Sequence, residues 1–205
     1  MSGEAWNAPR RRALLESPLL ACNYHHVPRE NREAVEARLR RLVRFGASLD
    51  LDRDVPAEGA TPGPRIVVGF YDSYREAGLF GADLCHRLGI RAYFFPVFEP
   101  FDEAGTADLT DAELADISTV HEIGFHSASH RSAVEITEET LEREVDEPVR
   151  RITALSGRPP RVGAWRGGAR YDDTVPANRR LRDLGVRYLM SNWSVEAIPS
   201  GAAPA

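Results

Sequence analysis

The strongest constraint on the fold of this chain is a regular alternation of short apolar segments with longer amphipathic ones. The short segments span residues 19–24, 66–70, 91–97, 122–126, 161–165 and 186–190, and the amphipathic ones span 33–45, 74–88, 111–118, 137–155 and 174–184. Short apolar segments of this kind predict buried strands, whereas apolar residues at a spacing of three and four predict helices. Strands that alternate with helices predict an α/β fold with a parallel sheet.

About seven such units suit a distorted or incomplete (β/α) barrel of about seven parallel strands. A doubly wound open sheet is the alternative, although no glycine-rich phosphate turn follows the first strand. We expect one domain over residues 19–198, preceded by an N-terminal extension over 1–18 and followed by a flexible tail over 199–205. Thr110 is expected to cap the helix that begins at residue 111.

The composition excludes several kinds of chemistry. All 26 basic residues are Arg, so a lysine Schiff base and the lysine-containing Walker A phosphate loop are both excluded. The formal net charge of −5 argues against a nucleic-acid surface. The two cysteines, Cys22 and Cys85, are too few for a disulfide framework or a cysteine-rich zinc site and are expected to be buried thiols. Any metal ion must therefore be held by histidine and carboxylate side chains.

No stretch of the sequence approaches the roughly 20 apolar residues of a membrane-spanning helix. Three arginines at 10–12 precede an apolar stretch, which loosely resembles a signal peptide, but Glu16 and Pro18 interrupt it. We therefore expect a cytoplasmic protein without nucleic-acid or membrane partners.

Three polar residues follow predicted strands and form a candidate metal site. Asp72 comes just after the strand at 66–70, while His126 and His130 lie at and just beyond the strand at 122–126. In one helical turn, a spacing of four places two imidazoles on the same face. Because active sites of α/β barrels lie at the carboxyl ends of the strands, the three side chains are expected to meet there. Two histidines and a carboxylate with open positions are typical of hydrolytic metal sites.

The sequence resembles the polysaccharide deacetylases with the NodB-homology domain, carbohydrate esterase family 4, over about residues 19–198. Residues 121–130, HEIGFHSASH, closely match the second motif of this family. Residues 69–74, GFYDSY, align with the first motif, TFDDG followed by an aromatic residue. Residues 24–27, YHHV, and 89–95, GIRAYFF, resemble the family's first strand end and a later strand. The resemblance implies a NodB-type (β/α) barrel and removal of an acetyl or acyl group from an amide or ester of a carbohydrate or small-molecule substrate.

The resemblance also implies roles for individual residues. Asp72, His126 and His130 would bind a divalent ion, zinc in the first place, with cobalt, nickel or manganese as alternatives. Water on that ion would attack the acetyl carbonyl. Arg166 would orient an acidic group, and Glu196 is its expected partner.

The departures from the family pattern concern proton transfer. The family's catalytic base corresponds to Tyr71, and a phenol with a pKa near 10 is a poor base at neutral pH. The C-terminal Leu-x-His motif that supplies the family's general acid is not found. We therefore predict a catalytic role for His25 or for Tyr71 itself. The predicted substrate-binding residues are His26, Tyr74, Trp165 and Trp193.

Three hypotheses about function follow from this pattern. The first is a metal-dependent hydrolase of the deacetylase type. The second is a divergent family member that uses the metal site for isomerisation, elimination or cyclisation in specialised metabolism. The third is a catalytically inactive binding protein. We favour the hydrolase because the metal-site block is the best-preserved part of the sequence.

Overall fold

The computed structural model describes residues 19–51, 63–99 and 107–199. Strands β1 (Leu19–Tyr24), β2 (Ala47–Ser48), β3 (Arg65–Tyr71), β4 (Tyr93–Phe95) and β5 (Glu122–Ile123) form one parallel sheet. Strands β6 (Val162–Gly163), β7 (Tyr188–Met190) and β8 (Val195–Ala197) form a second sheet, in which β8 runs antiparallel to β7. A parallel bridge between Phe125 and Gly163 links the two sheets.

This arrangement confirms the predicted α/β class with its mostly parallel sheet. Within the described residues, the strands do not form one continuous hydrogen-bonded ring, since a single bridge joins the two sheets. The antiparallel strand β8 departs from the all-parallel expectation. Its short connection from β7 explains this, because a two- to five-residue turn can join only antiparallel neighbours.

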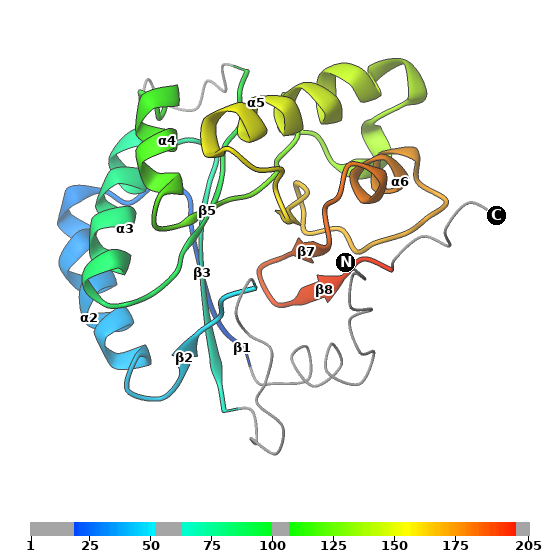
Figure 1. Cartoon of the computed structure of the whole chain (residues 1–205). Coiled ribbons are helices and arrows are strands. Elements are labelled where there is room, and N and C mark those ends of the chain that lie inside the picture. Colours follow the sequence, from blue (N-terminus) through cyan, green and yellow to red (C-terminus); the bar gives the residue numbers. More distant parts are fainter. Residues whose placement is uncertain (1–18, 52–62, 100–106, 200–205) are drawn as a thin grey trace, which may run out of the picture.

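The helices lie outside the larger sheet (Figure 1). They are α2 (Arg32–Leu42), α3 (Arg75–Arg87), α4 (Asp111–Ser118), α5 (Glu147–Ser156) and α6 (Pro176–Asp183). As expected, Thr110 caps α4, where its side chain accepts a hydrogen bond from the Glu113 N–H. Among the described helices, none is both long and apolar enough to span a membrane. The extension at 1–18 and most of the tail at 199–205 lie outside the described residues, so those two predictions stay as they are.

Strand β3 shows why the sheet is buried on both faces. Ile66, Val68 and Phe70 belong to the core beneath the helices, whereas Val67 and Tyr71 belong to an inner core with residues of β4, β6 and β7. Successive side chains of a strand point to opposite faces, so an almost continuous apolar strand requires cover on both sides. The expected burial of Cys22 and Cys85 is also confirmed, because both are free thiols in the core beneath the helices.

The helix predicted over 137–155 is not a uniform α-helix. It consists of a 3₁₀ turn (Glu138–Thr140), a π-helical turn η4 (Glu142–Asp146) and α5. Pro148 lies in the first turn of α5 and has no N–H to donate to the carbonyl four residues earlier, which belongs to Glu144. The Glu147 N–H bonds instead to the Glu142 carbonyl, five residues back. The proline therefore explains why the α-helical register begins only at α5.

Candidate metal centre

The three predicted ligands come together at the carboxyl ends of β3 and β5. One ligand atom of each of Asp72, His126 and His130 lies within 4.8 Å of the others. The Nε2 atoms of both histidines are 3.4 Å from Oδ1 of Asp72. Asp72 and His126 are buried, and the His130 side chain is 17% exposed, so solvent reaches the cluster from the His130 side.

The backbone at this site adopts left-handed conformations that non-glycine residues rarely use. Asp72, Ser73 and His130 have φ angles of 63°, 61° and 57°. Such angles cost about 1–3 kcal/mol each and persist only where the surroundings enforce them. Ser73 is fixed to the end of β4, because its Oγ donates to the Val97 carbonyl at 2.7 Å and accepts from the Val97 N–H at 2.9 Å. The strain therefore lies where two of the three ligands are presented.

The orientation of His126 suits a metal ligand. Its Nδ1 lies 2.6 Å from the carbonyl oxygen of Ala164. Because a carbonyl can only accept, the ring proton must sit on Nδ1, which leaves a lone pair on Nε2 directed toward Asp72. In this tautomer the 3.4 Å separation between His126 Nε2 and Asp72 Oδ1 is a contact between two acceptors rather than a hydrogen bond.

The protonation states also suit a cation. Burial raises the pKa of the Asp72 carboxyl, whereas the neighbouring imidazoles lower it when they carry a proton, and the net direction is below the usual value. Burial lowers the pKa of His130. At neutral pH the carboxylate is therefore charged and His130 is neutral, which are the forms that bind metal ions. Oδ1 of Asp72 is buried and has no hydrogen-bond partner among the described residues, so the residues fit a bound cation that would satisfy it.

Tyr71 lies beside this cluster, and its ring meets that of His126 edge-on at a centroid distance of 6.2 Å. The ring stacks on Phe95 at a centroid distance of 4.8 Å and on His25 at 5.2 Å. Its hydroxyl donates to Oδ1 of Asn23 at 3.2 Å. Burial, reinforced by the charge of Asp72, raises the pKa of Tyr71 above its ordinary value. Tyr71 therefore packs within the inner core, and its raised pKa makes the phenol a poorer base, which disfavours its predicted role as the catalytic base.

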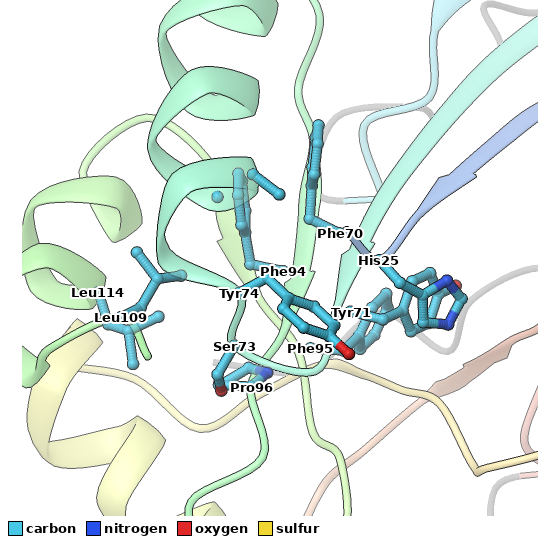
Figure 2. Close-up of a pocket in the computed structure, with 12 residues that line it drawn as sticks. His25, Phe70, Tyr71, Ser73, Tyr74, Phe94, Phe95, Pro96, Leu109 and Leu114 are labelled. Atoms are coloured by element: carbon cyan, nitrogen blue, oxygen red, sulfur yellow. The ribbon is translucent and has the colours of Figure 1, made fainter. Parts of the chain in front are cut away.

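His25 is a further polar side chain that lies beside the three predicted ligands. Its Nε2 lies 3.6 Å from Oδ2 of Asp72, and its side chain is 52% exposed. His25 and Tyr71 lie at one end of a pocket, with Leu109 and Leu114 at the other (Figure 2). Tyr74 lines the same pocket, and the centroid of its ring lies 5.7 Å from that of the His26 ring. Of these predicted residues, His25 is thus the one that lies beside Asp72.

The two tryptophans predicted to bind substrate, Trp165 and Trp193, occupy opposite environments. Trp165 is 3% exposed, packs edge-on against Phe125 and donates its Nε1–H to Asn178 of α6 at 2.8 Å. It is a core residue, so its predicted substrate contact is wrong. Trp193 lies between β7 and β8 and is 87% exposed. The neighbouring Asn192 carbonyl accepts from the Asn23 side chain at 3.2 Å, which fixes this turn beside β1.

The predicted pairing of Arg166 with Glu196 is also wrong. The nearest carboxylate to Arg166 is that of Glu135, at 3.9 Å, and the Arg166 side chain is 56% exposed. Glu196 instead accepts from the Tyr171 N–H at 3.1 Å. Glu196 lies on the antiparallel strand β8, opposite Leu189.

Two contributors to the site were missed by the sequence prediction. Asn23 links Tyr71 to the β7–β8 turn, and the signal for it was a polar residue inside an apolar strand, immediately before the histidines. The Ala164 carbonyl orients His126, and a backbone group leaves no signal in a sequence.

Fold and site together define an α/β protein with a candidate two-histidine, one-carboxylate metal centre at the strand ends. Residues 58–189, more than half of the chain, match the family model of polysaccharide deacetylases. The chain therefore belongs to the polysaccharide deacetylase family.

Solved structures agree with this assignment at the level of the fold. The deacetylase PplD of Streptococcus pyogenes, in complex with acetate, has a TM-score of 0.62 and 14% identity, covering 80% of this chain and 79% of its own. IcaB from Ammonifex degensii has a TM-score of 0.64 and 15% identity, and the match covers 90% of this chain and 88% of IcaB. A de-N-acetylase from Aggregatibacter actinomycetemcomitans has a TM-score of 0.65 and 14% identity, and the match covers 84% of this chain and 86% of the de-N-acetylase. No curated protein sequence matches the chain.

Proposed function

We propose that this protein is a metal-dependent hydrolase that removes an acetyl or acyl group from an amide or ester of a carbohydrate-like or small molecule. One observation carries the proposal: a chain of the polysaccharide deacetylase family retains a buried cluster of Asp72, His126 and His130 whose atoms can hold one ion. A charged carboxylate without a hydrogen-bond partner, next to an imidazole fixed in the ligand tautomer, supports this role.

A divalent ion held by these three residues would supply Lewis acidity, which polarises an acyl carbonyl and makes water a stronger nucleophile at neutral pH. We propose zinc for this ion. Asp72 contributes the negative charge that retains the cation, and Ala164 fixes the ring of His126 through its carbonyl. The partly exposed side of His130 leaves access for substrate.

Proton transfer in this proposal belongs to His25. It is a half-exposed titratable side chain beside Asp72, with its Nε2 3.6 Å from Oδ2 of that carboxylate. Tyr71 contributes by stacking against His25 and thereby holding its ring.

A carbohydrate-like substrate agrees with the exposed Trp193 beside β1, because an aromatic face can cover the apolar face of a sugar ring. The relatives with solved structures include a deacetylase crystallised with acetate, which is the product that this proposal expects. We extend the proposal to a cytoplasmic location, and therefore to a small substrate.

Acetate release tests the proposed function. Purified protein loaded with zinc is incubated with a panel of N- and O-acetylated sugars and small acetylated amides and esters. We expect acetate release that stops with a chelator and returns when metal is added. Stoichiometric metal binding without release from any member of the panel would favour a non-hydrolytic reaction, and absence of metal binding would contradict both enzymatic hypotheses.

Tyr71→Phe is expected to leave the rate of acyl release within about threefold of the original, because the phenol hydroxyl bonds Asn23 and carries no proton of the reaction. The lost hydrogen bond should lower the free energy of unfolding by about 0.5–1.5 kcal/mol. Steady-state kinetics and urea unfolding of the metal-loaded protein check both values. A loss of rate beyond about a hundredfold, the effect of removing a proton-transfer group, would return the catalytic role to Tyr71.

A further inference from the structure

Glu144 is a fully buried carboxylate beside the loop that carries two of the metal ligands. It belongs to η4 and has no exposed surface. Its Oε1 accepts from the Ser129 hydroxyl at 2.7 Å, and its Oε2 accepts from the Ser129 N–H at 3.1 Å. Its backbone carbonyl accepts from the Ala128 N–H at 3.3 Å. Glu144 therefore makes three hydrogen bonds to the two residues that precede His130.

Pro148 removes one helical hydrogen-bond donor from the carbonyl of Glu144. In an α-helix this carbonyl would accept from the N–H of residue 148, but proline has none. The oxygen accepts from the Ala128 N–H. A π-helical turn, which often occurs at functional sites, presents the Glu144 side chain and carbonyl toward the same loop.

His130 has a φ of 57°, a conformation that its surroundings must enforce, so the 126–130 loop needs hydrogen bonds from other segments. Its own bonds are local: Ser127 Oγ donates to the Arg131 carbonyl, and the His130 N–H donates to the Ser127 carbonyl at 3.3 Å. The Glu99 N–H also donates to the Ala128 carbonyl, at 3.0 Å. Ser129, next to His130, is bonded to Glu144 through both its N–H and its hydroxyl.

The carboxylate of Glu144 matches this task in its chemistry. Both groups that it receives from Ser129 are donors, and an ionised carboxylate offers two acceptor oxygens. Arg131 Nε and Arg143 Nη1, at 3.7 and 3.8 Å from Oε1, compensate part of the cost of burying the charge. A glutamine would present one acceptor and one donor, so it could not keep both bonds in their present form.

We propose that Glu144 is a positioning residue that holds the 126–130 loop, and His130 above all, in the conformation that binds the metal ion. The proposal rests on the metal site of the proposed function but not on the identity of the substrate. Glu144 touches neither substrate nor ion. Its effect reaches the ion only through the loop residues that it bonds, Ala128 and Ser129, and through His130.

Metal affinity of the full chain tests this role. The variants are Glu144→Gln and, because a changed buried charge can impair folding, Ser129→Ala, which removes the hydroxyl partner only. Asp146→Asn is the matched control, since Asp146 lies in the same π-helical turn, is 5% exposed and pairs with Arg180 at 2.7 Å rather than with the loop. Zinc dissociation constants come from competition with a chromogenic chelator, and thermal unfolding of the metal-free proteins measures stability separately. The cobalt-loaded proteins supply a visible spectrum that reports ligand geometry.

We expect Glu144→Gln to weaken zinc binding by about 10- to 100-fold, as is typical when a partner of a metal ligand is removed. Ser129→Ala should also weaken zinc binding, and both variants should change the cobalt spectrum. Asp146→Asn should lower the melting temperature while leaving zinc affinity and the cobalt spectrum unchanged. If both Glu144→Gln and Ser129→Ala bind zinc as tightly as the original chain, Glu144 serves stability alone and the inference is overturned. If the original chain itself binds no divalent metal, the proposed function fails first.

Discussion

Asp72→Asn is expected to abolish stoichiometric metal binding and to lower acyl release by more than about a hundredfold. The substitution keeps the size of the side chain and removes the negative charge that attracts a divalent cation. A neutral amide is also a weaker metal ligand than a carboxylate. Without the ion, neither polarisation of the acyl carbonyl nor activation of water remains, and each is a large contribution to such catalysis.

The measurement combines metal content, by mass spectrometry of the purified protein, with steady-state acetate release. Thermal unfolding adds a test that does not depend on the substrate. A ligand present at a hundred times its dissociation constant stabilises the folded state by about 2.7 kcal/mol, so the original chain should melt at a higher temperature when zinc is added. Asp72→Asn should show no such increase.

The matched control is Asp108→Asn, because Asp108 is an exposed aspartate outside the cluster, in an isolated bridge with Tyr74. This variant should keep both the metal and the thermal response. Full metal content in Asp72→Asn would mean that the ion lies elsewhere, and the Asp72–His126–His130 assignment would then be wrong.

The sequence was most informative where function depends on local spacing. The motif around His126 and His130 and the acid after the strand at 66–70 predicted the three residues that the structure brings within 4.8 Å. The alternating pattern also predicted the order of strands and helices. Both signals are local, because strand ends and helical turns are set by neighbouring residues.

What the sequence did not predict depends on contacts between distant segments. Nothing near Trp165 indicates that Asn178, on a later helix, would receive its indole N–H. The partner of Arg166 lies 31 positions earlier in the chain, at Glu135, and only the packing of loops decides that. Pro148 was visible in the sequence, but its effect on the carbonyl of Glu144 becomes meaningful only once the 126–130 loop lies beside it.

The residue that alters the first motif, Tyr71, packs in the inner core. Where the family has an aspartate, this chain has Tyr71, which fills the inner core between Phe95 and His25. The replacement removes a carboxylate next to the metal ligands and supplies a flat surface on which an imidazole rests. The position that carries the family's base has thereby become the support of a histidine on the neighbouring strand end.

His25→Ala is accordingly expected to reduce the rate constant for acyl release by about 10²- to 10⁴-fold, the usual contribution of one positioned proton-transfer group. The zinc content should stay unchanged, because His25 contacts Oδ2 of Asp72 and is not one of the three clustered ligands. Steady-state kinetics at matched metal content provides the measurement. Added imidazole should restore part of the rate, since a small molecule can enter the space left by the half-exposed ring.

Two further variants separate proton transfer from packing. His25→Phe keeps an aromatic ring against Tyr71 and lacks a titratable nitrogen, so it should be as slow as His25→Ala and insensitive to imidazole. His26→Ala, at the adjacent position, removes a histidine that contacts Tyr74 and should retain most of the rate constant. An active His25→Phe variant would show that the ring serves only to cover Tyr71. A loss of zinc in His25→Ala would instead make His25 a ligand, and the proton would then have to be carried by a group outside the pocket beside Tyr71.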